Sequence, residues 1–488
     1  MPDLITVLPV ESGVLSGRAA DGGEATVVVL AWSAEEPWRV GEIAMPAPIG
    51  QSEVFGRGDG EPGEARVRFG RQRPGTFTPG PPLQGEGVSR RQLVITSKEE
   101  GLVIDSVGQC ELRVNGVRTN AAVIRPGDTI YLRRQLLLLC ARRPAFIPEG
   151  RFLPQTAWGE FGEPDVFGIL GESPATWHLR EQLAFVGRSN KHVLLVGASG
   201  SGKELAARAI HAMSSRAPKP FVPRNAATLP AGLIDAELFG SARNYPNAGM
   251  PERPGLVGSA DGGTLFLDEI AELPLEQQAH LLRVLDARGE YTRLGESTPR
   301  RADFRLVGAT NRDPSTLKHD LGARLTSIIE LLPLASRRED IPLLARHLLF
   351  AAARESPDVA ERFVGRDGAG RTFARFTPGF IDCALRQDLK NNTRQLEALL
   401  WKSMSESAQS YVEPPKEWRR EPASAPPGAA VSASSRPSSS EPSADQIRDA
   451  LGAVGGSIGK AASLLGLSNR FALYRLMKKH GIGDKDPE

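Results

Sequence analysis

The chain has 488 residues, too many for one hydrophobic core, so we expect about two to four domains. Its 40% hydrophobic and 24% charged content is typical of globular domains, and a formal net charge of +2 excludes a global basic field for nucleic acid. The three cysteines, Cys110, Cys140 and Cys383, argue against a disulfide framework or a zinc cluster, and we predict that they are buried apolar residues. No signal-peptide pattern is apparent, and no apolar run approaches the ~20 residues of a membrane span, so a cytoplasmic protein is expected.

Residues 1–145 have the pattern of an all-β domain. Short runs rich in Val, Ile and Leu recur, and Gly, Pro and Asn separate them. The runs are residues 25–30, 92–96, 102–105, 130–132 and 136–139. Residues 58–63 and 71–87 are rich in Gly and Pro and are predicted to be loops. Together these features predict a β-sandwich or barrel.

Four short motifs in this region resemble a forkhead-associated (FHA) domain, a β-sandwich that reads phosphothreonine. They are FGR at residues 55–57, VSRRQ at 88–92, VNG at 114–116 and PGD at 126–128. The resemblance implies that Arg57, Ser89 and Arg90 bind the phosphate of a phosphothreonine protein. The chain departs from the family at Gln92, where a His is usual, and at residues 108–111, where GQCE replaces Ser-x-Asn-Gly. The alternative is a sandwich that keeps the fold and packs on the next domain.

A phosphate-binding loop is predicted at residues 197–204, which read GASGSGKE. An apolar run precedes it at residues 192–196, and a helix-forming run follows at 205–212. Glycines let backbone N–H groups curl around an anion, the helix N-terminus adds its positive dipole end, and Lys203 can reach the outer phosphates. The predicted ATP-binding residues of the loop are Gly197, Ala198, Ser199, Gly200, Ser201, Gly202, Lys203 and Glu204.

A second motif supports this site, because an apolar strand pattern at residues 263–267 ends in the paired acids Asp268 and Glu269. This resembles a Walker B element. In that element Asp268 would hold Mg²⁺ and Glu269 would polarise the attacking water. Glu204 stands where a Ser or Thr often ligates Mg²⁺, so the metal must depend more on Asp268, waters and phosphates.

Residues 166–345 alternate strand-like and helix-like runs, which predicts an α/β domain with a parallel sheet. Residues 166–405 resemble the AAA+ ATPase domain of sigma-54-dependent transcription activators. The matching stretches are residues 197–204, 237–240, 260–270, 272–274, 281–285 and 308–312. The resemblance implies that Asn311 senses the γ-phosphate, that Arg394 is the lid's sensor II arginine, and that Ile169 and Leu170 lie near the adenine. It also implies a homo-oligomer, from a dimer to a hexameric ring, with each ATP at a subunit boundary.

The chain departs from this family in two places, a surface loop and the first of two arginine positions. Its GAFTGA loop, which contacts sigma-54, corresponds here to NYPNAG at residues 244–249, so the aromatic residue is displaced, the Thr is absent and Pro246 stiffens the tip. The family's two arginine fingers correspond to Lys318 and Arg324. A Lys keeps the charge but lacks the planar fork that grips phosphate oxygens. Ordinary surface charge is the alternative interpretation of both residues.

The rest of the chain divides into a lid, a linker and a small helical unit. Helices are predicted over residues 340–356 and 377–407, forming an all-α lid, and the seven Pro and eight Ser of residues 412–443 predict a flexible linker. Residues 444–482 resemble a Fis-type helix-turn-helix, and its last helix is basic. The residues that this resemblance implies in DNA contact are Asn469, Arg470, Phe471, Tyr474, Arg475, Lys478 and Lys479.

The sequence therefore predicts a multidomain chain. The predicted segments are an FHA-like β-sandwich (1–145), a connector (146–165), an AAA+ α/β core (166–345), a helical lid (346–411), a disordered linker (412–443) and a Fis-type DNA-binding domain (444–488). Its expected function is ATP-dependent transcription regulation, with sigma-54 RNA polymerase and DNA as partners and no membrane association. The alternative is a non-motor regulator that does not engage sigma-54 and uses ATP only to set its oligomeric state.

Overall fold

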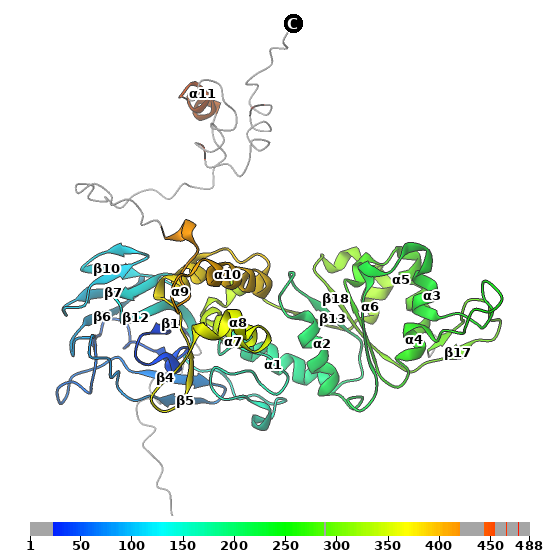
Figure 1. The fold of residues 1–488 in the computed structure, drawn as a ribbon, viewed down its shortest axis with the longest axis horizontal. Coiled ribbons are helices and arrows are strands. Elements are labelled where there is room, and N and C mark those ends of the chain that lie inside the picture. Colours follow the sequence, from blue (N-terminus) through cyan, green and yellow to red (C-terminus); the bar gives the residue numbers. More distant parts are fainter. Residues whose placement is uncertain (1–22, 287–288, 420–443, 454–464, 466–476, 478–488) are drawn as a thin grey trace, which may run out of the picture. The chain divides into compact units, whose positions relative to one another are not determined.

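The computed structural model describes residues 23–286, 289–419 and 444–453, and the single positions 465 and 477. The chain divides into two compact units, Met1–Arg420 and Glu421–Glu488. Figure 1 shows the ribbon, with colour running from blue to red along the sequence. In the first unit a sandwich of sheets, a parallel α/β domain and a set of lid helices follow one another along the chain.

Two antiparallel sheets form the N-terminal sandwich. One has eight strands in the order β5-β4-β2-β1-β12-β11-β8-β9, and the other has four in the order β10-β7-β6-β3. Val28 and Leu30 of the first sheet share one buried core with Leu93, Ile95 and Ile104 of the second, so the sheets pack face to face. The bounds are β1 Glu24–Ser33, β2 Ile43–Ala44, β3 Ser52–Phe55, β4 Phe69–Arg73, β5 Thr76–Pro79, β6 Leu93–Lys98, β7 Gly101–Ser106, β8 Leu112–Val114, β9 Val117–Arg118, β10 Ala121–Ile124, β11 Thr129–Leu132 and β12 Leu136–Pro144.

The predicted strands of this region are confirmed, but the prediction of one long loop over residues 71–87 is wrong. The segment contains β5 and the end of β4, which pair as a hairpin at the edge of the sheet. Gly75, at a φ of 75°, follows Pro74 and allows the tight turn. A Pro is tolerated in an edge strand because an edge strand leaves half of its N–H groups outside the ladder, which explains why Pro79 can end β5.

The central domain is a five-stranded parallel sheet with helices on both faces (Figure 1). Its strand order is β14-β15-β18-β13-β19. Apolar residues of α1 and α2 pack on one face, and those of α3 to α6 pack on the other. The strands are β13 Val193–Val196, β14 Phe221–Asn225, β15 Thr264–Asp268, β18 Arg305–Thr310 and β19 Ser327–Glu330, and the helices are α1 Pro174–Gly187, α2 Lys203–Ala212, α3 Ile234–Phe239, α4 Gly255–Ser259, α5 Leu275–Asp286 and α6 His319–Arg324.

The lid departs from the prediction in three ways. It continues past residue 411, where the disordered linker was predicted to begin, because Val412 is buried and pairs with Phe376, and Lys416–Trp418 form a short 3-10 helix. The lid also contains a short hairpin, β20 Val364–Arg366 with β21 Thr372–Ala374, so it is not all-α. The helix predicted over residues 377–407 is two helices, because the backbone becomes extended at Gln387 (φ −73°, ψ 146°), and Asn392, at a φ of 51°, begins the second one. The helices are α7 Ile341–Glu355, α8 Pro357–Ala360, α9 Pro378–Arg386 and α10 Asn392–Glu406.

The sandwich and the lid share a hydrophobic core. Val27, Val29 and Leu139, on the outer face of the large sheet, belong to the same buried cluster as Ile341 and Phe380 of the lid helices. Polar contacts reinforce this seam. They are Trp32 Nε1 to Phe376 O at 2.8 Å and Thr129 Oγ1 to Asp382 Oδ1 at 2.7 Å. The ion pairs Arg143–Glu339 at 3.2 Å and Arg73–Glu172 at 2.5 Å also tie the sandwich to the segments that precede α7 and α1. The sandwich is therefore packed directly on the lid.

The three cysteines differ in burial. Cys140 and Cys383 are buried, as predicted, and burial raises the pKa of each to about 12. Cys110 is only partly buried, because its loop lies at the sandwich surface, so the prediction that it is buried is wrong. In the described parts of the chain, no helix is both long and apolar enough to cross a bilayer. In the second unit, α11 spans Ala444–Ala453.

Candidate nucleotide site

The Gly-rich loop follows β13 and leads into α2, as its motif predicts. Gly200 and Gly202 have φ angles of 72° and 100°, a conformation that favours glycine. No side chain caps the N-terminus of α2, so its first N–H groups are directed at the loop without a side-chain acceptor. Gly197 N donates to Thr310 O at 3.1 Å, which ties the loop to the end of β18. This combination of turn and helix start is suited to an anion.

Lys203 is the central cation of this loop. It is 9% exposed, and its Nζ donates to Gly197 O at 2.7 Å and to Ala198 O at 3.2 Å. Burial lowers the pKa of Lys203, and the nearby Asp268 and Glu269 oppose that shift. The ammonium group is therefore held under the loop, close to both predicted acids.

A buried hydroxyl beside Lys203 lacks a partner. Ser201 is 4% exposed, and within the described residues its Oγ makes no hydrogen bond. A buried polar atom of this kind calls for an external acceptor or donor, such as a phosphate oxygen or a water. Glu204, by contrast, points along the surface of α2 and pairs with Arg208 at 2.8 Å. The donor groups of the loop therefore fit a polyphosphate.

The paired acids lie at the carboxyl end of β15. Asp268 ends that strand and accepts a hydrogen bond from Glu269 N at 3.0 Å, and Glu269 adopts a φ of 51°. Both residues are partly exposed. Ligands of open parallel sheets gather at this edge, and carboxylate oxygens are ligands that Mg²⁺ accepts. The residues fit a nucleotide with its metal.

The lid contacts the phosphate loop directly. Arg394 Nη1 donates to Ser199 Oγ at 2.9 Å, which brings the predicted sensor II residue to the phosphate loop. Thr393 Oγ1 donates to Gly200 O at 2.7 Å, and a Cβ on Gly200 would lie 2.3 Å from Asn391 O. The start of α10 therefore touches the backbone of the loop.

Asn392 is a functional candidate that the sequence analysis missed. It is fully buried, its Nδ2 donates to Ser199 O at 2.9 Å, and its Oδ1 accepts from Leu334 N at 2.7 Å. One amide thus joins the phosphate loop, the segment between β19 and α7, and α10. The only sequence signal was the pair Asn391-Asn392, since Asn is enriched at helix caps and in left-handed conformations.

The remaining predicted nucleotide residues lie around this centre. Asn311 is exposed and follows the end of β18, next to the carbonyl of Thr310 that binds the loop. Ile169 and Leu170 are 6% and 5% exposed. The backbone of Ile169 is already engaged, since its N–H donates to Asp165 Oδ1 at 2.9 Å and its carbonyl accepts from Arg180 Nη2 at 2.7 Å. It can therefore offer an apolar side chain to a base.

The predicted finger residues lie on the opposite side of the domain core, at α6. Lys318 is partly exposed and precedes the helix, and its backbone N–H donates to Gln278 Oε1 at 2.8 Å. The Arg324 side chain is 56% exposed and pairs with Asp286 at 2.5 Å. Neither residue joins the cluster around Lys203 within one chain. An exposed position is what a residue acting on a neighbouring subunit needs.

The loop at residues 244–249 is closed by its own backbone. Ser241 and Arg253 exchange hydrogen bonds of 3.0 and 2.9 Å, Asn244 N donates to Met250 O at 2.8 Å, and Asn244 Oδ1 accepts from Gly249 N at 2.9 Å. Tyr245 is 40% exposed and packs on Gly295, which belongs to the loop beside the hairpin of β16 Glu290–Tyr291 and β17 Arg300–Arg301. The tip is therefore an ordered, exposed loop.

The predicted phosphopeptide residues lie together on the sandwich. Arg57 N donates to Ser89 O at 3.1 Å, and a Cβ on Gly56 would lie 2.1 Å from Arg90 O, so the two segments are adjacent. Arg57 Nε is buried and has no partner among the described residues. Ser89 Oγ already accepts from Gln109 N at 3.1 Å. The described geometry thus brings the backbone segments of the three residues side by side.

Gln92 explains the departures from the FHA pattern. It is fully buried, its Nε2 donates to Cys110 O at 2.9 Å, and its Oε1 accepts from Cys110 N at 3.2 Å. A Cβ on Gly108 would lie 2.5 Å from Gln92 Oε1. Gln92 therefore supports the loop that stands where the family carries Ser-x-Asn-Gly.

The seven residues predicted to contact DNA lie outside the described residues. They are Asn469, Arg470, Phe471, Tyr474, Arg475, Lys478 and Lys479.

The fold and the site are those of an AAA+ P-loop NTPase-like domain. A parallel sheet carries a Gly-rich loop with Lys203, and paired acids follow a neighbouring strand. A helical lid covers the loop. The family described as "Sigma-54 interaction domain" matches residues 169–328. The chain is 36% identical over 319 residues to the transcriptional regulatory protein ZraR of Escherichia coli O157:H7, covering 64% of this chain and 69% of that protein. The chain therefore belongs to the family of sigma-54-dependent transcriptional regulators.

Other relatives match over shorter stretches. ZraR of Escherichia coli K12 is 41% identical over 238 residues, which cover 47% of this chain and 51% of that protein. The chain thus spans about half the length of this relative. A crystal structure of NtrX from Brucella abortus in complex with ATP is 28% identical and has a TM-score of 0.44, and the match covers 67% of this chain and 71% of that one.

Proposed function

We propose that this protein is an ATP-dependent transcription regulator whose central domain binds ATP with Mg²⁺ and hydrolyses it in a homo-oligomeric ring. The observation that carries the proposal is the convergence of Lys203, Ser201 and Arg394 on one Gly-rich loop, with Asp268 and Glu269 close to Lys203. Three donors and two acids at the same edge of a parallel sheet match what a triphosphate and its metal require.

Each group has a distinct role in the proposal. Lys203 and the N-terminus of α2 bind the phosphates, and Asp268 holds the metal, which when bound neutralises the charge on the phosphates. Glu269 orients the attacking water, Asn311 and Arg394 sense the phosphate end, and Ile169 and Leu170 contact the base. Arg324 and Lys318 reach the site of the neighbouring subunit, since both lie away from the site of their own chain.

The proposal assigns input and output to the other segments. The sandwich (1–145) binds a phosphothreonine protein through Arg57, Ser89 and Arg90, and the unpartnered Arg57 Nε supports an anion there. The connector (146–165), the core (166–345) and the lid (346–411) transmit the signal. The linker (412–443) carries a Fis-type DNA-binding domain (444–488), and sigma-54 RNA polymerase is the target of the ring.

A second function, a non-motor regulator, is favoured by one observation. The tip at residues 244–249 lacks the Phe and Thr that carry the sigma-54 contact in the family, although its backbone is ordered. In this alternative ATP acts as a ligand that sets the oligomeric state, and regulation proceeds through DNA and protein contacts alone.

Open-complex formation by sigma-54 polymerase on a cognate promoter separates the two functions. The motor proposal expects stimulation that needs ATP and is lost in Glu269→Gln. The alternative expects no stimulation, and no gain when Phe and Thr are restored within residues 244–249. A matched control is Glu272→Gln, an acid close in sequence that pairs with Arg312 rather than facing Lys203.

A further inference from the structure

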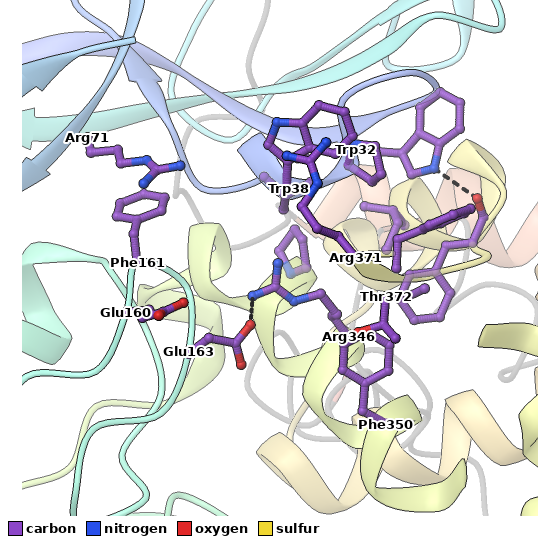
Figure 2. A pocket seen from close by; sticks show the side chains of 18 of the residues that line it. Trp32, Trp38, Arg71, Glu160, Phe161, Glu163, Arg346, Phe350, Arg371 and Thr372 are labelled. Carbon is purple, nitrogen blue, oxygen red and sulfur yellow. Dashed lines mark hydrogen bonds and ion pairs between the residues drawn. The ribbon is translucent and has the colours of Figure 1, made fainter. Parts of the chain in front are cut away.

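A cavity of about 670 Å³ lies between the sandwich, the connector and the lid (Figure 2). Trp32, Trp38 and Arg71 come from the sandwich, Phe161 from the connector, and Arg346 and Phe350 from α7. The volume falls within the range that binding sites for small molecules occupy, roughly 300–1,000 Å³. None of these residues belongs to the nucleotide site.

The walls of the cavity combine aromatic faces with guanidinium groups. Arg371 lies over the ring of Trp38 at 3.8 Å from its centroid, and Arg71 lies over the ring of Phe161 at 4.9 Å. Figure 2 shows both stacked pairs at the edge of the same space, with Phe350 on another side. Stacked guanidinium groups are held in place and remain able to bind an anion through their edges.

The two stacked arginines keep their binding edges available. Arg71 uses Nε to contact Glu42 Oε1 at 3.3 Å, and Arg371 uses Nε to contact Asp367 Oδ2 at 2.7 Å. Among the described residues, the terminal nitrogens of both side chains have no hydrogen-bond acceptor. Their side chains are 44% and 53% exposed. Two parallel N–H groups on each fork match the two oxygens of a carboxylate.

Arg346 differs from these two arginines. It is committed to the connector, donating to Gly162 O and to Glu163 Oε1, the latter at 2.9 Å. Burial lowers its pKa, and Glu163 opposes the shift. Arg346 therefore holds the cavity together, whereas Arg71 and Arg371 use only Nε for their ion pairs and keep their terminal nitrogens for a ligand.

We propose that this cavity binds a small ligand with a planar aromatic body and a carboxylate. The aromatic body packs among Trp38, Phe161 and Phe350, and the carboxylate is gripped by Arg71 and Arg371. Because one wall belongs to the lid and another to the sandwich, the ligand joins these two segments. Binding at this cavity does not require that ATP be hydrolysed.

The test is calorimetric titration of the full chain with 2-naphthoate, compared with its neutral analogue 2-naphthylmethanol. We expect one saturable site for the acid and at least about tenfold weaker binding of the alcohol, since a charge-assisted contact contributes about that factor. Arg71→Gln and Arg371→Gln should each weaken naphthoate binding about tenfold. Arg142→Gln is the matched control, because Arg142 is an exposed sandwich arginine paired with Glu24 outside the cavity.

Three results of these titrations would overturn the proposal, and competition by ATP would be a fourth. They are absence of saturable binding by the wild-type chain, equal affinity for the acid and the alcohol, and unchanged affinity in both arginine variants. A repeat titration at saturating ATP must leave the affinity unchanged, since competition would assign the probe to the phosphate loop. Thermal unfolding of each variant checks the fold, and Arg371→Gln keeps the test valid if Arg71→Gln is unstable, because Arg371 lies on an exposed turn.

Discussion

The phosphate loop and the loop at residues 244–249 are built in opposite ways. The phosphate loop is held by side chains from distant segments, including Asn392, Thr393 and Arg394 of α10, which reach back across more than 190 residues. The other loop is closed mainly by backbone hydrogen bonds, between residues 241 and 253 and to Leu294, with one side-chain contact from Asn244.

This difference has a consequence for function. The phosphate loop and the lid are joined by side-chain contacts. A substitution at one of these contacts in the loop therefore disturbs the lid as well. A loop closed by its own backbone keeps its shape when exposed side chains change, which explains how residues 244–249 stay ordered without the family's Phe and Thr. The proposed nucleotide site and the tip at residues 244–249 can therefore be altered separately.

Replacing Asn392 should produce the largest effect, because it tests the interdependence directly. Asn392→Ala removes two buried hydrogen bonds and forces Ala into a φ of 51°, which should lower the free energy of unfolding by about 3 kcal/mol. Asn392→Gly is the matched variant, because Gly accepts that φ, so it should cost about 1 kcal/mol less than Ala. Urea unfolding measures both. Equal stability of Asn392→Ala and wild type would show that the Asn392 side chain does not hold the phosphate loop to the lid.

Lys203→Ala should weaken ATP binding by at least about 100-fold, since it removes the buried cation of the phosphate loop, and about 100-fold corresponds to about 2.7 kcal/mol. The measurement is titration with a fluorescent ATP analogue. Lys219→Ala is the control, because Lys219 is an exposed lysine of the same domain. Comparable affinities in the two variants would contradict the assignment of the site.

Acid should destabilise the central domain through His192. Its Nδ1 accepts a hydrogen bond from Leu306 N at 3.0 Å, and burial, followed by the charge of Arg305, lowers its pKa to about 4. Because the unfolded chain binds this proton below a pH of about 6.5 and the folded chain does not, stability is lost as the pH falls from about 6.5 toward 4. Between pH 7 and pH 5 the loss should be about 2 kcal/mol.

The matched pair for this prediction is His192→Asn and His319→Asn. Asn keeps an acceptor near the position of Nδ1 and does not titrate, so His192→Asn should flatten the dependence of the urea midpoint on pH. His319 is 97% exposed at its side chain, so its variant should follow wild type. A wild-type profile without a decline from pH 6.5 to pH 5 would show that His192 charges freely.

The smallest effect is expected at the tip of the other loop. Tyr245→Ala removes a ring that is 40% exposed and packs on Gly295, while the backbone bonds of the loop remain. The free energy of unfolding should change by less than about 1 kcal/mol, and ATP affinity should change less than twofold. A large loss in either quantity would mean that the tip supports the fold, and the contrast between the two loops would fail.

The sequence was most informative where function and local structure share one short segment. The Gly-rich run, Lys203 and the following helix are contiguous, so spacing alone predicted the strand, the turn and α2. Apolar runs likewise predicted the sandwich strands and β15 with its terminal acids. These signals act over a few residues, where backbone preference and side-chain chemistry agree.

Features that depend on distant contacts were not predictable. Asn392 reads as an ordinary polar residue until α10 packs on the phosphate loop, and its left-handed backbone lies in the break between α9 and α10 that interrupts the helix predicted over residues 377–407. The hairpin of β4 and β5 was hidden by Pro74 and Pro79, which only an edge position tolerates. The cavity between sandwich and lid depends on a shared core that no single segment encodes.

ATP turnover per chain, measured as a function of protein concentration, decides whether the central domain hydrolyses ATP in a ring. If neighbouring subunits complete each site through Arg324 and Lys318, turnover per chain should rise steeply with concentration, and Glu269→Gln should abolish it while ATP still binds. Turnover that stays at background at every concentration, despite saturating ATP, would contradict the account and leave ATP as a ligand of a non-motor regulator.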